Sequence, residues 1–163
     1  MSEPFIRKAQ MRDVKVIHNL LLTCSTQGVL LPRSLTQLYN SLREFNVLDP
    51  GDGGSIIGCC ALSIVWDGLA EIRSLIVDEK ARRGGHGRDL VDVCVDEARR
   101  LGIYKVFTLT YQDTFFQKQG FVEVSKEVLP QKIWADCVNC PKFPECDEIA
   151  MLLEIQPENS GES

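Results

Sequence analysis

Two spacings of hydrophobic residues alternate along the chain, one typical of strands and one typical of helices. Runs rich in β-branched and aromatic residues predict strands at 5–9, 45–48, 55–66, 69–77, 104–109, 121–126 and 149–155. Apolar residues that recur every three or four positions predict helices that begin after Asp13 and at 34–43, 87–101 and 113–119. Short polar stretches separate these elements, so the pattern predicts a folded chain of mixed strands and helices.

Turn signals connect these elements into a fold class. Asp67-Gly68 is a tight-turn dipeptide and 49–54 is rich in Asp and Gly, so three consecutive strands are expected to pair antiparallel. The helix 87–101 ends at Gly102, and a right-handed crossover through it predicts one parallel strand pair. We therefore expect an α/β (α+β) fold whose central mixed, mostly antiparallel sheet has about six to seven strands and is flanked by about four helices.

Length and charge restrict the classes of function. The 163 residues fit one domain, which we assign to 1–156, followed by a polar, flexible tail at 157–163. A formal net charge of −5 gives no electrostatic reason to expect nucleic acid or an anionic membrane as a partner. No apolar stretch approaches the roughly 20 residues that span a bilayer, and the N-terminus lacks the apolar core of a signal peptide. We expect a cytoplasmic protein.

A glycine-rich turn with basic residues lies between the strand 69–77 and the helix 87–101. It reads Arg82-Arg83-Gly84-Gly85-His86-Gly87-Arg88. Glycines let backbone N–H groups approach an anion closely, and the beginning of a helix favours negative charge. The turn therefore predicts a pyrophosphate site. Neither a Gly-Lys-Ser/Thr sequence nor a Gly-x-Gly-x-x-Gly fingerprint is present, which argues against a nucleoside triphosphate or NAD as the ligand.

Cysteine usage favours reduced thiols. The chain has seven cysteines, an odd number without a secretory context, which does not fit a disulfide framework. Cys137, Cys140 and Cys146 are close in sequence, but structural zinc normally takes four cysteine or histidine ligands and only three are in range. We expect no metal there. We expect a free-thiol or redox-sensitive loop instead. The alternative is a zinc site in which another side chain supplies the fourth ligand.

The glycine turn resembles the Arg/Gln-x-x-Gly-x-Gly/Ala pyrophosphate loop of the GNAT superfamily of acyl-CoA N-acyltransferases, with Arg82, Gly85 and Gly87 at the motif positions. The predicted order of strands and helices is also the GNAT order, and the likeness covers nearly the whole chain. Within the superfamily, the chain resembles short, single-domain N-acetylglutamate synthases. The segments that carry this closer likeness are 30–34, 70–75, 106–110, 115–121 and 129–130.

The resemblance implies acetyl-CoA as cofactor and acetyl donor. The backbone of Leu75, Ile76 and Val77 is expected to hold the pantetheine arm. The N–H group of Ile76 or Val77 is expected to stabilise the negative charge that develops on the thioester carbonyl. The loop is expected to receive the pyrophosphate, with Arg83 and Arg88 as the preferred direct contacts. The loop residues assigned to the cofactor are Arg82, Arg83, Gly84, Gly85, His86, Gly87 and Arg88.

Proton transfer requires further groups, because the ammonium group of the acceptor must lose a proton before it attacks. Glu71 is the best-placed carboxylate, on the strand that leads to the loop, and its alternative role is an ion pair with Arg73. Many superfamily members have a tyrosine as general acid where this chain has Phe116. Tyr111 is the candidate substitute, although a CoA thiolate leaves readily enough that no acid is required.

The acceptor implied by the resemblance is L-glutamate, in the first step of arginine biosynthesis. Arginine binds a carboxylate with two parallel hydrogen bonds, so cations are expected to select glutamate. Arg33, Arg73 and Lys118 are the candidates. The larger synthases also have an amino-acid-kinase-like domain that holds the inhibitor arginine, and the absence of this domain here leaves arginine control in doubt.

Two rival functions follow from the same residues, because the fold determines the donor more firmly than the acceptor. One is acetylation of glutamine, another amino acid or a protein N-terminus. The other is a sensor that binds acetyl-CoA or an amino acid without turnover. Superfamily members often form dimer contacts near the segment that holds Trp134, so a homodimer is one expected assembly, and coverage of the acceptor pocket is the alternative role of that segment.

Overall fold

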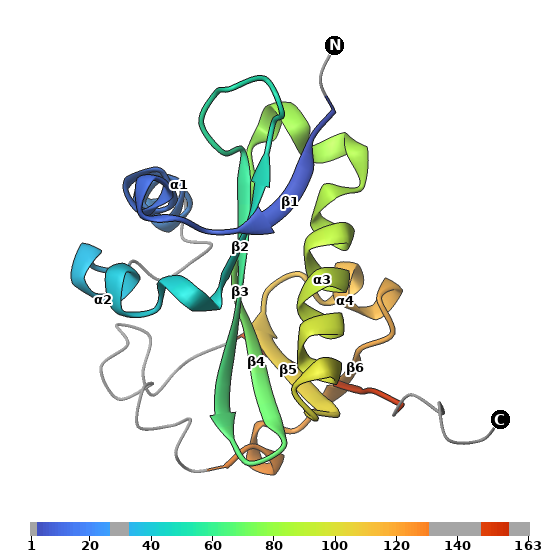
Figure 1. The fold of residues 1–163 in the computed structure, drawn as a ribbon. Coiled ribbons are helices and arrows are strands. Elements are labelled where there is room, and N and C mark those ends of the chain that lie inside the picture. Colours follow the sequence, from blue (N-terminus) through green and yellow to red (C-terminus); the bar gives the residue numbers. More distant parts are fainter. Residues whose placement is uncertain (1–2, 27–32, 131–147, 157–163) are drawn as a thin grey trace, which may run out of the picture. The chain divides into compact units, whose positions relative to one another are not determined.

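The structure, a computed structural model, describes residues 3–26, 33–130 and 148–156, without the side chains of 24–26, 80 and 83 (Figure 1). The strands are β1 (Phe5–Lys8), β2 (Phe45–Asp49), β3 (Gly58–Trp66), β4 (Leu69–Val77), β5 (Lys105–Thr110), β6 (Val122–Val124) and β7 (Ile149–Glu154). The α-helices are α1 (Val14–Thr26), α2 (Leu35–Asn40), α3 (His86–Arg100) and α4 (Asp113–Lys118). Short 3₁₀ turns are η1 (Met11–Asp13), η2 (Leu42–Glu44), η3 (Glu79–Gly84) and η4 (Lys126–Val128). This order confirms the predicted one.

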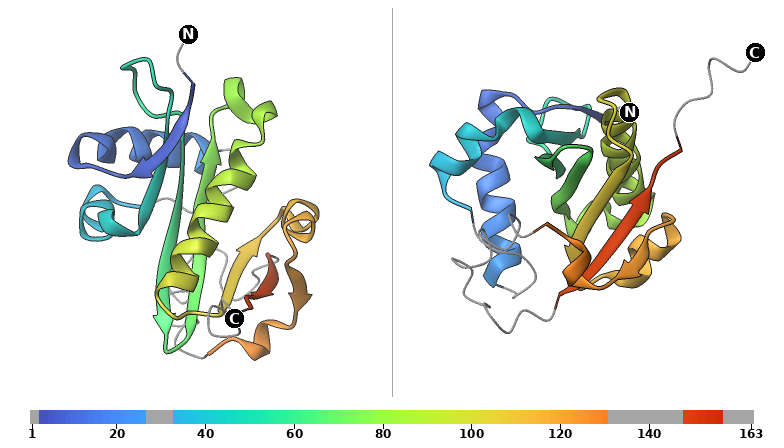
Figure 2. Two further views of the ribbon diagram at one scale, coloured as in Figure 1. Left: turned by 45° about the vertical axis from the view of Figure 1, so that its right-hand side comes forward. Right: turned by 90° about the horizontal axis from the view of Figure 1, so that it is seen from below.

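The strands form a seven-stranded sheet in the order β1-β2-β3-β4-β5-β7-β6. β1 and β2 pair antiparallel, as do β2 and β3. β4 and β5 are parallel, with Leu69 opposite Lys105, and α3 is the connection between them. β7 lies antiparallel between β5 and β6, as Figure 2 shows. The predicted mixed, mostly antiparallel sheet with one parallel connection is therefore confirmed.

The chain divides into two compact units. The first unit comprises Met1–Leu62 with Ile72–Cys94, and the second comprises Ser63–Glu71 with Val95–Ser163. β3, β4 and α3 contribute residues to both units. The expectation of one domain over 1–156 stays a prediction, and the expected tail at 157–163 lies outside the described residues.

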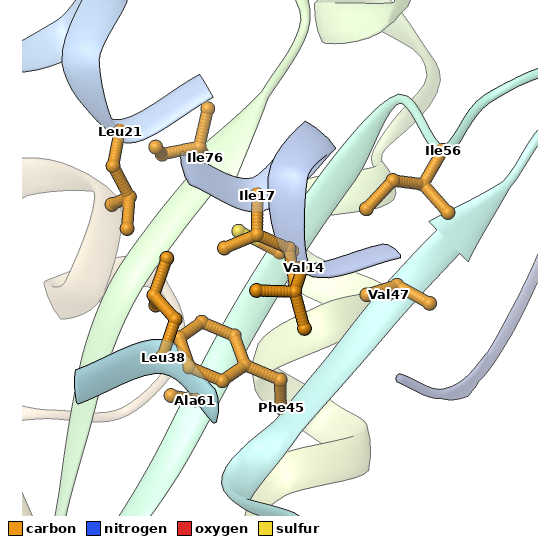
Figure 3. Packing of buried hydrophobic residues seen from close by; sticks show 10 residues of the cluster. Val14, Ile17, Leu21, Leu38, Phe45, Val47, Ile56, Ala61 and Ile76 are labelled. Carbon is orange, nitrogen blue, oxygen red and sulfur yellow. The ribbon is translucent and has the colours of Figure 1, made fainter. Parts of the chain in front are cut away.

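The first unit has a core of buried apolar side chains from two helices, three strands and the segment just before β3. α1 and α2 contact each other, and Figure 3 shows their apolar side chains pointing toward those of the strands. Burying one such side chain stabilises the fold by about 1.5–3 kcal/mol relative to leaving it exposed. The buried members of this cluster are Val14, Ile17, Leu21, Leu38, Phe45, Val47, Ile56, Cys59, Ala61 and Ile76.

Helix α2 begins where the sequence predicts and ends earlier. Ser34 is its N-cap, and the hydroxyl group of Ser34 accepts a hydrogen bond from the backbone N–H of Gln37 at 3.1 Å. The predicted end near Arg43 is wrong, because Ser41 leaves the helical conformation with φ −108° and ψ 18°. The Ser41 hydroxyl donates to the Gln37 carbonyl at 2.7 Å, and η2 follows as a separate turn.

Two predicted strands are also too long. The strand expected at 55–66 begins only at Gly58, after the turn that follows β2. The strand expected at 121–126 is limited to Val122–Val124, because Ser125 begins η4. The Ser125 hydroxyl accepts a hydrogen bond from the N–H of Glu127 at 3.3 Å. At Ser125 a local turn ends the strand that the apolar pattern alone would continue. Residues 55–57 lie outside the regular strand, although the N–H of Ile57 still donates to the carbonyl of Leu48 at 2.9 Å.

The second unit has its own apolar cluster. Phe107, Leu129 and Ala150 are buried at its centre, with half-buried apolar residues packed against them. Its strands β5 and β7 pair along their whole length, from Lys105 opposite Glu154 to Thr110 opposite Ile149. This antiparallel pair therefore places the cluster residues of β5 and β7 in neighbouring strands.

Arg7 joins the first strand of the first unit to two carboxylates. Its Nε donates to Oδ2 of Asp49 at 2.9 Å, and its Nη1 donates to Oδ2 of Asp13 at 2.8 Å. Asp13 also accepts the backbone N–H of Gln10 at 2.7 Å, and Asp49 accepts that of Gly51 at 2.8 Å. Both carboxylates are therefore shared between a guanidinium group and a backbone turn.

These contacts shift the acid equilibria of both carboxylates. Burial acts to raise the pKa of Asp13, but hydrogen bonds from Arg7 and Gln10 outweigh it, so the pKa lies below its ordinary value. The N–H of Gly51 and then the Arg7 guanidinium lower the pKa of Asp49. The same ion pairs raise the pKa of Arg7.

Strand β4 contains a residue in the left-handed conformation. Ser74 has φ +56°, while the other described residues with positive φ are glycines. This conformation costs an L-residue about 1–2 kcal/mol, and within a strand it interrupts the regular pairing as a bulge does. Ser74 is buried, so the surrounding packing holds it there.

We predict that Asp13→Asn weakens the loss of stability in acid. Both aspartates have a lower pKa in the folded chain, so their stabilisation is present above the ordinary value of 3.8 and is lost as the pH falls through the folded-state values. Urea unfolding at roughly pH 6 and roughly pH 3 measures the difference. Asp67→Asn, in the exposed turn between β3 and β4, is the control and should keep the wild-type difference. An Asp13→Asn variant with the wild-type pH dependence would contradict this assignment.

We also predict that Ser74→Gly leaves the unfolding free energy equal or raises it by up to about 1 kcal/mol, because glycine adopts positive φ without strain. Ser74→Val should lower it by about 2 kcal/mol or more. Ser63, buried in β3 without a positive φ, is the matched site, where glycine should destabilise. Denaturant unfolding of the three variants and the wild type measures the effect, and equal destabilisation by the two glycine substitutions would refute the strain at Ser74.

Candidate active site

The turn after β4 presents the beginning of α3. The chain passes from Val77 through η3 into His86, the first residue of α3 (Figure 1). The N–H of Asp89 donates to the carbonyl of Gly85 at 3.2 Å, which is the first hydrogen bond of the helix. Helix geometry leaves the preceding N–H groups, of His86, Gly87 and Arg88, without intrahelical acceptors. Together with the helix dipole, these groups can bind an anion such as pyrophosphate.

The structure explains why two positions of this turn are glycine. Gly85 has φ +74°, a conformation that L side chains rarely adopt. At Gly84, a Cβ atom would lie 2.6 Å from Nε2 of His86, so the imidazole occupies the space that a side chain would need. At Gly85 the backbone conformation therefore disfavours other residues, whereas at Gly84 a side chain would have to displace the His86 imidazole.

The arginines of the turn differ in position. Arg82 donates through Nε to the carbonyl of Val77 at 2.9 Å, so its side chain ties the turn to the end of β4. Arg88 is exposed at the start of α3. The side chain of Arg83 lies outside the described residues. Of the two arginines predicted to contact the ligand directly, the structure therefore describes the surroundings of Arg88 alone.

The three residues predicted to hold the pantetheine arm directly follow the left-handed residue Ser74. Leu75 and Val77 are half-buried, whereas Ile76 belongs to the core of the first unit. Beyond them, the N–H of Asp78 donates to the carbonyl of Ile57 at 2.8 Å. The backbone from Leu75 to Val77 thus lies between the left-handed residue Ser74 and this hydrogen bond.

Arg33 lies in the first unit beside the N-cap of α2. Its Nη2 donates to the hydroxyl of Ser41 at 3.1 Å, and its guanidinium carbon lies 5.5 Å from the centre of the Phe45 ring. These contacts fix the plane of a partly buried cation. Arg73, on β4 of the same unit, is half-buried.

Three other predicted residues belong to the second unit. Glu71 is buried, with 9% of its surface exposed, and its Cα lies opposite that of Phe107 in the parallel pair. Tyr111 directly follows β5 and has 36% of its surface exposed. Lys118 is exposed at the end of α4. The structure thus places a largely buried carboxylate on β4 and an accessible phenol group after β5.

Phe116 occupies the position where many superfamily members have a tyrosine. It is buried, and its ring packs edge-on against Phe115 at 5.1 Å and against Phe121 at 5.2 Å between centroids. A hydroxyl group there would need a hydrogen-bond partner in an aromatic environment. The ring of Phe116 therefore stabilises the second unit by packing.

Two residues near the site were missed by reasoning from the sequence. The left-handed φ of Ser74 has no signal in a single sequence, because serine occurs in many conformations. Cys59 donates through Sγ to the carbonyl of Ser74 at 3.3 Å, a contact that depends on the pairing of distant segments. The sequence does place Cys59 inside a long apolar strand, but it gives no sign of the contact with Ser74.

Within residues 3–26, 33–130 and 148–156, no group of three or more His, Cys, Asp or Glu residues is placed to hold a metal ion. Cys137, Cys140, Cys146 and Trp134 lie outside these ranges. None of the helices in the described part of the chain is long and apolar enough to cross a membrane.

Comparisons with known proteins give the family. The model of the Acetyltransferase (GNAT) family matches residues 16–121. An uncharacterized N-acetyltransferase of Chlorobaculum tepidum is 42% identical over 154 residues, which cover 94% of this chain and 98% of that protein. An amino-acid acetyltransferase of Mycobacterium tuberculosis is 37% identical over 122 residues, which cover 74% of this chain and 70% of that protein.

A solved structure extends the likeness to the fold. It is that of N-acetylglutamate synthase from Neisseria gonorrhoeae complexed with coenzyme A and N-acetyl-glutamate, with a TM-score of 0.84 and 28% identity. The match covers 96% of this chain and 36% of that chain, so the present chain spans about a third of the larger synthase. The family match, the GNAT order of elements and the glycine turn at the start of α3 agree. The chain therefore belongs to the GNAT family of acetyltransferases, with acetyl-CoA as the acetyl donor.

Proposed function

We propose that this acetyltransferase moves the acetyl group of acetyl-CoA to the α-amine of L-glutamate. The observation that carries the proposal is the likeness to proteins named amino-acid acetyltransferase, together with the N-acetyl-glutamate bound in the structurally similar synthase. The partly buried cation of Arg33 supports it, because glutamate presents two carboxylates to be bound.

The donor is held along β4 and the turn. The backbone of Leu75, Ile76 and Val77 binds the pantetheine arm, and the first N–H groups of α3 bind the pyrophosphate with Arg88 and Arg83 beside them. The N–H of Ile76 or Val77 stabilises the oxyanion of the tetrahedral intermediate. Arg82 acts mainly by tying the turn to Val77, since its Nε is engaged by that carbonyl.

Glu71 removes the proton from the ammonium group of glutamate, directly or through water, before the amine attacks the thioester carbon. Its burial supports this role, because few water molecules compete with a bound acceptor for a carboxylate that is only 9% exposed. The intermediate then collapses, and the C–S bond breaks to release the CoA thiolate. Tyr111 is accessible and protonates the thiolate if an acid takes part.

Arg33 binds a carboxylate of glutamate through its guanidinium group. Contacts with Ser41 and Phe45 fix this group in advance, so little conformational entropy is lost when the acceptor binds. Arg73 and Lys118 are the further cations assigned to the acceptor. A cation that recognises the side-chain carboxylate would favour glutamate over glutamine, whose side chain is neutral.

The first test is CoA thiol release by purified protein with acetyl-CoA and each of the twenty amino acids. We expect the highest kcat/KM for glutamate, with at least about a tenfold preference over glutamine, the value of one charge-assisted hydrogen bond. Turnover only with another amine would refute glutamate as acceptor while keeping the donor site. Binding of acetyl-CoA without turnover of any amine would refute the catalytic proposal and favour a sensor.

The second test concerns Arg33. Arg33→Ala should raise KM for glutamate by about tenfold or more, because a charge-assisted contact is lost, and should leave KM for acetyl-CoA within about twofold. Arg43→Ala, which removes an exposed arginine from the neighbouring η2, is the matched control and should change neither value. Equal increases in both KM values for Arg33→Ala would contradict its assignment to the acceptor.

A further inference from the structure

The thiol of Cys59 reaches the backbone at the left-handed residue of β4. Its Sγ donates to the carbonyl oxygen of Ser74 at 3.3 Å, and both residues are buried. A buried carbonyl that lacks a partner is costly, and the left-handed φ of Ser74 turns its peptide groups away from the regular strand. The thiol therefore supplies a donor to the carbonyl of this left-handed residue.

Gly58, the residue before Cys59, lies close to the backbone of the same part of β4. A Cβ atom at Gly58 would lie 2.9 Å from the carbonyl oxygen of Ile76 and 3.5 Å from Cα of Val77. Gly58 and Cys59 thus contact the backbone of β4 from Ser74 to Val77 at two points. This stretch includes the N–H groups assigned to the thioester and the pantetheine arm.

Cys60, the next residue of β3, contacts a different residue from Cys59. Successive side chains of a strand point to opposite faces of the sheet, and the Sγ of Cys60 accepts a contact from Sγ of Cys94 at 3.6 Å. Cys59 and Cys60 are both fully buried in the first unit. Cys60 therefore offers a matched site, where a thiol can be removed without touching Ser74.

We propose that Cys59 is a positioning residue for the acetyl donor: its thiol holds the Ser74 carbonyl and so fixes the backbone N–H groups of Leu75, Ile76 and Val77 against acetyl-CoA. This inference rests on the proposed role of that backbone and extends it to a residue outside the motif. It does not depend on which amine accepts the acetyl group.

The test compares Cys59→Ala, Cys59→Ser and Cys60→Ala in the full chain. Cys59→Ala should raise the dissociation constant of acetyl-CoA, measured by calorimetry without an acceptor, by about threefold or more, near the lower value of a neutral hydrogen bond because a thiol is a weak donor. Cys59→Ser, which retains a donor, should restore most of the affinity. Cys60→Ala removes an equally buried sulfur and should keep the affinity within about twofold of wild type.

Hydrogen exchange of the apo protein gives a second readout that needs no ligand. The amides of Leu75, Ile76 and Val77 should exchange faster in Cys59→Ala than in Cys60→Ala, and this comparison remains possible if one variant is too unstable for calorimetry. Equal effects of the two alanine variants on both affinity and exchange would overturn the proposal, as would wild-type behaviour of Cys59→Ala. Failure of glutamate as acceptor would leave both readouts unchanged and would concern the proposed function alone.

Discussion

The arrangement of the proposed donor site depends on one left-handed residue inside a strand. Ser74 takes a left-handed φ of +56° inside β4, at a cost of about 1–2 kcal/mol that glycine would avoid. Two contacts in the first unit support this conformation of Ser74. The nearby Ile76 side chain is packed in the core, and the Cys59 thiol donates to the Ser74 carbonyl. A regular strand would direct its N–H groups into sheet pairing, whereas an interrupted strand can present some of them to a ligand.

The same stretch of chain leads directly from the strand backbone proposed to bind the pantetheine arm to the helix start proposed to bind the pyrophosphate. β4 ends at Val77, whose carbonyl accepts Nε of Arg82, and η3 leads directly into α3. The imidazole of His86 fills the space over Gly84, and the positive φ of Gly85 turns the backbone into the helix. Strand backbone and helix N–H groups thus follow each other within a few residues, which suits a ligand with an amide-rich arm and a pyrophosphate.

Much of this was predictable from the sequence, and the exceptions have physical causes. Apolar spacing located the strands and helices because burial of side chains drives both patterns. The ends of α2 and β6 were not predictable, since hydrogen bonds of Ser41 and Ser125 decide them. The glycine turn was predictable because glycines and arginines at the start of a helix favour an anion whatever the rest of the fold. Ser74 and Cys59 were missed because their role exists only when β3 and β4 are adjacent. The roles of Glu71, Tyr111 and the acceptor-binding cations stay predictions.

We propose that the backbone from Leu75 to Val77 and the beginning of α3 together bind the acetyl donor. Backbone amide NMR during a titration with acetyl-CoA tests it most directly. We expect the largest chemical-shift changes on the amides of Leu75, Ile76 and Val77 and of residues 84–88, with small changes along β1 and β2. Saturable binding with the largest changes elsewhere, and none at these amides, would contradict it.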